Sequence, residues 1–139
     1  MATITRFEEL EIWQEARRFA FEVFEAHSNS ESFSQDSNLT DQIHTAIGLV
    51  MDNIAGGFER NGFTDFVPFL VMAIKSLAEV KSLLNKALSR NCISQHLFDQ
   101  FYEQADELGK KIKGLISYLN EPDLIGSNFK RQAVLDSKS

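Results

Sequence analysis

The chain has 139 residues, of which 43% are apolar and 24% are charged; this is the balance of one globular domain, and it excludes an intrinsically disordered protein. Its net charge of −6 argues against a general nucleic-acid-binding protein, because such binding depends on neutralising phosphates. The single cysteine, Cys92, excludes an intrachain disulfide and fits a reducing compartment. No apolar stretch approaches the roughly 20 residues that span a bilayer, so we expect a soluble cytoplasmic protein.

Four segments carry apolar residues at helical spacing, which predicts four helices. The predicted helices cover about residues 5–27, 39–59, 64–90 and 94–120. The polar stretch 28–37 has no periodicity and is predicted to be a loop with about one turn of structure.

Residues with the preferences of helix caps stand near these boundaries. Asn38 or Thr40 can accept a backbone N–H bond at the start of the second predicted helix, and Thr64 and Ser94 can do so for the third and fourth. Asn91 follows the third predicted helix and suits the left-handed conformation that often ends one.

Short connections between the second, third and fourth predicted helices make antiparallel neighbours the simplest arrangement. We therefore predict that residues 1–122 form an all-α, up-down-up-down four-helix bundle. Residues 123–139 lack a core pattern and are predicted to be a C-terminal tail, either docked through Leu124, Ile125 and Phe129 or disordered.

The first and third predicted helices carry more apolar surface than one bundle core requires. In a monomer part of this surface would meet water, and contiguous apolar patches of that kind mark interfaces. We therefore predict a homo-oligomer whose interface includes Ile12, Phe19, Val67, Val71 and Ile74. The alternative is that these are scattered surface residues, which need no special explanation.

No residue pattern specifies a catalytic, cofactor or metal site. A di-metal bundle needs two Glu-x-x-His pairs and two further inward carboxylates, whereas this chain has one loose relative, Asp41-x-x-His44. His27 and His96 lie in or beside predicted loops, and Cys92 stands in no recognisable nucleophile motif. The sequence therefore predicts a protein without enzymatic activity, metal or cofactor.

Asn53 lies within the apolar run of the second predicted helix. A buried amide must find hydrogen-bond partners, so we expect Asn53 to fix the register against a neighbouring helix or to bond a loop backbone. Ligand binding is the alternative role.

Basic residues concentrate in the second half of the chain, where ten of the 14 lie from Phe66 onward. The ordinary interpretation is a solvated helix face, with the later lysines also favoured near a helix C-terminus. The alternative is a phosphate-binding surface. Its candidate residues are Arg60, Lys75, Arg90, Lys110, Lys111 and Lys113.

Four blocks of residues occur in order through the first three predicted helices. They are Phe7-x-x-Leu10-x-x-Trp13-Gln14-x-Ala16, Gln42-Ile43-x-x-Ala46, Asn53-Ile54-Ala55-x-Gly57-x-x-Arg60 and Phe66-x-x-Phe69-Leu70-x-x-Ala73-x-x-Ser76-x-x-Glu79. Together they resemble the four-helix bundle family known as the 23S rRNA intervening-sequence proteins. The chain is similar as well to the accessory proteins of diversity-generating retroelements.

This resemblance implies a left-handed up-down bundle that assembles into a ring, typically a pentamer, with no established activity for most members. The retroelement accessory proteins bind a reverse transcriptase and nucleic acid through basic surfaces. The shared motif implies a structural role for Trp13, Asn53, Gly57 and Arg60.

The chain departs from the family pattern at several positions. His44 and Thr45 stand where the family usually has two arginines, Gly56 replaces a glutamate, and Lys75 replaces a glycine. The two missing arginines weaken the nucleic-acid hypothesis. Our first hypothesis is therefore a non-enzymatic homo-oligomer that acts as a scaffold for an unknown protein partner, and the second is a nucleic-acid-binding accessory protein with a reverse-transcriptase-like partner.

Overall fold

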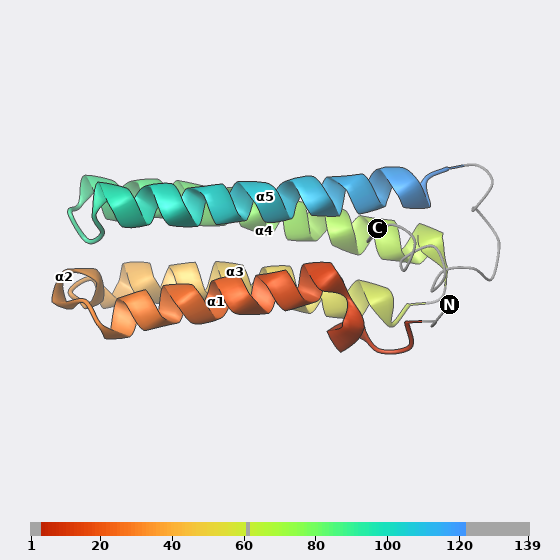
Figure 1. Ribbon diagram of the computed structural model, residues 1–139, viewed down its shortest axis with the longest axis horizontal. Coiled ribbons are helices and arrows are strands. Elements are labelled where there is room, and N and C mark those ends of the chain that lie inside the picture. The colour runs from red at the N-terminus through yellow and green to blue at the C-terminus, as the bar shows by residue number, and fades with distance from the viewer. Residues whose placement is uncertain (1–3, 61, 122–139) are drawn as a thin grey trace.

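The computed structural model describes residues 4–60 and 62–121, and these residues form helices and no strand (Figure 1). The all-α prediction is therefore confirmed. The predicted tail 123–139, with Leu124, Ile125 and Phe129, lies outside the described residues. The elements are a 3-10 turn η1 (Phe7–Glu9) and the helices α1 (Glu11–Ser28), α2 (Glu31–Ser34), α3 (Ser37–Phe58), α4 (Phe63–Ser89) and α5 (Gln95–Leu119).

The four long helices run side by side as a bundle of two layers, with α1 beside α3 in one layer and α5 beside α4 in the other (Figure 1). Consecutive long helices run in opposite directions, as the colour sequence in Figure 1 shows. The main contacts follow the closed order α1, α3, α4, α5 and back to α1. The left-handed twist that the resemblance implies stays a prediction. Within the described residues, no helix combines the length and the apolar character that a membrane span requires.

Apolar side chains at helical spacing form a single core along the bundle axis. Helix α3 contributes the most regular set, because Ile43, Ile47, Val50 and Ile54 are all fully buried and recur at intervals of three or four residues. Aromatic rings fill the wider spaces, and Phe19 of α1 packs edge-on against Phe101 of α5 with ring centroids 6.2 Å apart.

The structure corrects the expectation that Ile12 and Phe19 are partly exposed. Their side chains are only 6% and 3% exposed. Together with Ala16 and Val23, they form the side of α1 that faces the core. Burial within one subunit leaves these two residues little surface to offer a second subunit.

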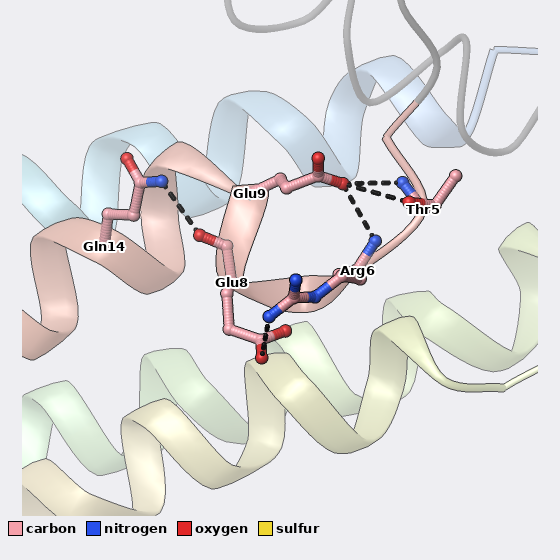
Figure 2. A network of polar contacts seen from close by, with 5 residues as sticks. All are labelled: Thr5, Arg6, Glu8, Glu9 and Gln14. Carbon is pink, nitrogen blue, oxygen red and sulfur yellow. Dashed lines mark hydrogen bonds and ion pairs between the residues drawn. The ribbon is translucent and has the colours of Figure 1, made fainter.

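The first predicted helix does not begin at residue 5. The carboxylate of Glu9 accepts hydrogen bonds from the backbone N–H groups of Thr5 and Arg6, at 2.8 and 3.0 Å, and Figure 2 shows how it closes this turn. Leu10 is extended, with φ −70° and ψ 128°, and α1 begins after it. The short turn lets Ile4 and Leu10 reach the core, where they are 4% and 1% exposed.

Two of the predicted caps differ from those in the structure. Asp36, rather than Asn38 or Thr40, caps α3, because its carboxylate accepts the N–H of Leu39 at 3.1 Å. Gly62 precedes α4 in place of the predicted Thr64, with φ 91°, a conformation that glycine adopts without strain.

Two other predicted residues at helix ends, Ser94 and Asn91, have the expected conformations. Ser94 caps α5 by accepting the N–H of Leu97 at 3.1 Å. Asn91 has φ 59°, and the N–H of Cys92 reaches the carbonyl of Ala87 at 2.8 Å, which satisfies a carbonyl at the end of α4. The stretch 28–37 holds one short helix, α2, whose Phe33 is buried.

Helices α3 and α4 pack closely against each other at Gly57. A methyl group at this position would lie 2.6 Å from Cβ of Phe69 and 2.9 Å from Cδ1 of Phe66. Separations this short are repulsive, so only glycine lets the two helix backbones come together here. Gly57 therefore has the structural role that the resemblance implies.

We predict that Gly57→Ala destabilises the protein by about 1–3 kcal/mol, because the new methyl group overpacks the contact with α4. Chemical denaturation followed by circular dichroism measures the change. Gly114→Ala is the control, since a Cβ there meets nothing within 4 Å and alanine is favoured in a helix by roughly 1 kcal/mol. Equal stabilities of the two variants would contradict the packing argument.

Candidate functional surfaces

Three of the six basic candidates for a phosphate-binding surface are held in ion pairs. Arg90 lies 2.8 Å from Asp36, and Lys110 lies 3.5 Å from Asp106. Lys111 contacts two glutamates of α1, at 2.9 Å for Glu15 and 3.4 Å for Glu11. These cations are therefore already partly neutralised within the subunit.

Arg90 acts at a helix junction. Its partner Asp36 also caps α3, and the bond from the Leu39 N–H, helped by Arg90, lowers the pKa of that carboxyl. Arg90 itself is the residue that ends α4. The pair therefore joins the end of α4 to the start of α3, which gives Arg90 a structural role.

Polar contacts join α1 to α5. Glu15 and Glu11 surround Lys111 and raise its pKa, mainly through the hydrogen bond to Glu15, and Gln104 donates to Glu22 at 2.9 Å. A cavity of about 300 Å³ lies beside these contacts. Its lining includes three glutamates, and comprises Glu15, Arg18, Phe19, Gln100, Glu103, Gln104, Glu107 and Leu108. An acidic lining disfavours phosphate binding on this side.

The remaining three basic candidates are Arg60, Lys75 and Lys113. The guanidinium of Arg60 lies 5.6 Å from the ring centroid of Phe69, so it packs over the α3–α4 contact. Lys75 and Lys113 are exposed on α4 and α5, and neither forms an ion pair among the described residues. These two lysines are therefore accessible to a phosphate.

Two further motif residues take structural positions. Trp13 is half-buried, with its ring 5.2 Å from that of Phe7 and beneath the guanidinium of Arg17. We expected Asn53 to bond a neighbouring helix or a loop backbone, but no such bond occurs among the described residues. Its amide donates instead to the carbonyl of Leu49, at 2.8 Å, one turn earlier in the same helix.

Helix α4 carries a row of four apolar residues and one lysine beside α5. We define the α4 row as Val67, Val71, Ile74, Ala78 and Lys81, which follow one another at helical spacing. Its last member bonds Asp106 of α5 at 2.8 Å, which places the row on the α5 side of α4. Val71 is 41% exposed, while Val67 and Ile74 are half-buried. This part of the predicted interface is accessible on a single subunit.

Helix α1 carries a second row beside α3, which the sequence analysis missed. We define the α1 row as Trp13, Arg17, Ala20, Phe24 and His27. His27 contacts His44 of α3, so the row lies on the α3 side of α1. Phe24 is 55% exposed, and the adjacent Phe21 is 60% exposed. The available signal in the sequence was the pair of large aromatic residues, Phe21 and Phe24, placed three positions apart in this helix.

The two rows lie on opposite sides of the bundle. The α1 row follows the edge between α1 and α3, and the α4 row follows the edge between α4 and α5. The first pair of helices forms one layer of the bundle and the second pair forms the other (Figure 1). The α1–α5 side between them carries the polar contacts of Lys111 and Gln104. Each subunit therefore presents two separate surfaces with exposed apolar side chains.

His27 and His44 meet where α1 and α3 pack together. Nδ1 of His27 lies 3.1 Å from Nε2 of His44, although the two residues are 17 positions apart. Phe24 packs against both rings, and Phe33 packs against that of His27. Burial lowers the pKa of His44, the positive charge of His27 lowers it further, and Asp41 opposes both effects.

We predict that this contact makes stability depend on pH. The pKa of His44 is lower in the folded protein than its ordinary 6.5, so the unfolded chain binds the proton more readily. The contribution of His44 to the free energy of unfolding should therefore be fully present above pH 6.5, and it should be lost as the pH falls through the lower pKa of His44 in the folded protein. Denaturation midpoints between pH 7.5 and 5.5 measure this slope. His44→Gln should flatten it, whereas an unchanged slope would contradict the assignment.

Comparison with known proteins fits this fold. None of the curated proteins matches the chain. The crystal structure of a protein of unknown function, from the S23 ribosomal protein family of Bacteroides thetaiotaomicron VPI-5482, superposes with a TM-score of 0.67 at 16% identity. The superposition covers 76% of this chain and 97% of that one. At this identity it shows a shared fold. The profile of the 23S rRNA-intervening sequence protein family matches residues 8–114. The chain therefore belongs to this family.

Proposed function

We propose that this protein is a non-enzymatic, cytoplasmic homo-oligomer that acts as a scaffold for a protein partner. The observation that carries the proposal is the pair of exposed apolar rows on opposite sides of the bundle. Side chains as large as Phe21 and Phe24 lose contact with water when a second surface covers them, which favours association by about 25 cal/mol for each Å² of apolar area buried.

The positions of the rows favour a ring. A subunit with two different adhesive surfaces on opposite sides can contact its neighbours head to tail, and such contacts close into a ring when the rotation between subunits allows it. In this arrangement the α1 row of one subunit meets the α4 row of the next. A ring is also the assembly that the family resemblance implies, with five subunits as the expected number.

The charge distribution gives the nucleic-acid alternative less support. Arg90, Lys110 and Lys111 are engaged by carboxylates of the same chain, and releasing each cation for a phosphate would break an existing ion pair. The net charge of −6 adds long-range repulsion of a polyanion. We therefore place the partner-binding role ahead of a role in binding RNA or DNA.

Light scattering coupled to size-exclusion chromatography tests the assembly. We expect several subunits at micromolar concentration, and we expect Phe24→Glu to yield a smaller species, because the new carboxylate would be desolvated in the interface. Gln100→Glu changes the charge equally on the exposed surface of α5 and should leave the assembly intact. A monomeric wild-type protein, or equal masses for all three proteins, would remove the basis of the proposal.

A titration with labelled single- and double-stranded RNA and DNA tests the alternative. At about 150 mM salt we expect no binding tighter than roughly 1 μM, because the net charge of −6 opposes the approach of a polyanion. Submicromolar binding that weakens steeply with salt would favour the nucleic-acid role instead. In that case the variants Lys75→Ala and Lys113→Ala would show whether the exposed lysines carry the contact.

A further inference from the structure

We propose that His27 and His44 bind a divalent transition-metal ion, of the kind that imidazole ligates, and that the bound ion joins α1 to α3. Zn²⁺, Ni²⁺ and Cu²⁺ have this preference. The inference does not depend on the proposed scaffold function.

The separation of the two ring nitrogens carries the proposal. Nδ1 of His27 and Nε2 of His44 are 3.1 Å apart. Imidazole nitrogens lie about 2.0–2.1 Å from zinc, so two of them at a tetrahedral angle are about 3.4 Å apart. The two nitrogens therefore need to separate by only about 0.3 Å, and each ring must also turn so that its lone pair points at the ion rather than at the other ring.

The hydrogen bonding of the rings is compatible with metal binding. In the structure one facing nitrogen must donate its proton to the other, and an ion would take the place of that shared proton. Among the described residues, neither imidazole ring forms another hydrogen bond. Each ring can therefore carry its proton on the far nitrogen, which leaves both facing nitrogens free to act as ligands.

Aromatic rings pack against both histidines. Phe24 lies 5.7 Å from the ring of His44, and Phe33 lies 5.7 Å from that of His27. These contacts help to keep the site half-buried. Asp41, one turn before His44 on α3, provides a nearby negative charge that would offset the charge of the ion.

The site offers two protein ligands. Within residues 4–60 and 62–121, no group of three His, Cys, Asp or Glu residues gathers to hold a metal. Water would complete the coordination, which implies modest affinity and leaves open positions. The gain from such an ion is structural, because it binds only when α1 and α3 are packed together and so stabilises the folded state.

Thermal unfolding of untagged, chelator-treated protein at pH 7.5 tests the site, with NiCl2, ZnCl2 or CuCl2 in tenfold molar excess. We expect at least one of these ions to raise Tm by about 3 °C or more. His27→Gln and His44→Gln should each abolish the rise. The matched control, His96→Gln, alters the exposed histidine at the start of α5 and should retain it. No rise in the wild-type protein, or an equal rise in all three variants, would overturn the proposal.

A second measurement does not depend on the variants folding. NMR spectra of the imidazole groups in the wild-type protein should show the His27 and His44 signals shifting together as metal is added, with a stoichiometry of one ion per chain. The His96 signals should change little. Changes centred on His96, or spread over surface carboxylates, would show that the ion binds elsewhere and that the assignment is wrong.

Discussion

The close approach of α3 and α4 is the constraint on which the rest of the structure depends. Gly57 has no side chain, so the rings of Phe66 and Phe69 lie directly against the backbone of α3. Because interiors are close-packed, this contact sets the distance between the two helices and the direction in which each turns its side chains. The buried residues of α3 then face α1 and α4, and the outer rows are left at the bundle edges.

Ion pairs link several helices, and in doing so they engage cations that could otherwise contact other molecules. Lys111 joins α5 to α1, and Lys81 joins α4 to α5. Arg90 joins the end of α4 to the start of α3. Exposed ion pairs of this kind contribute little stability individually. Their larger effect is to engage part of the positive charge within the subunit, which favours protein contacts over phosphate contacts.

The α1–α3 edge combines two features that have a common origin. Phe24 is exposed on the outside of this edge and also packs against both histidine rings. A subunit bound at the α1 row would bury Phe24 further and would reduce the access of water to the pair His27 and His44. Assembly and the chemistry of the histidines would then be coupled through one aromatic side chain, without any movement of the helices.

The four long helices, the all-α class and several helix ends could be predicted from the sequence. Periodic apolar residues determine which segments are helical, because a helix repeats every 3.6 residues whatever its neighbours are. Local rules also suffice for Ser94 and Asn91, since each acts on backbone groups within a few residues. Asp36 and Glu9 were not predicted as capping residues because neighbouring polar residues could also have accepted hydrogen bonds from the backbone N–H groups there.

Only the tertiary structure decided which side of each helix is buried and which distant residues meet. Helix α1 has two adjacent apolar stripes, and the sequence cannot say which one faces the core, because the choice depends on the rotation of α1 against α3 and α5. That rotation buries Phe19 and exposes Phe24. The same packing brings His27 to His44 and Lys111 to Glu15. Such pairs leave no local pattern in the sequence, since their members belong to different helices and meet only when the bundle closes.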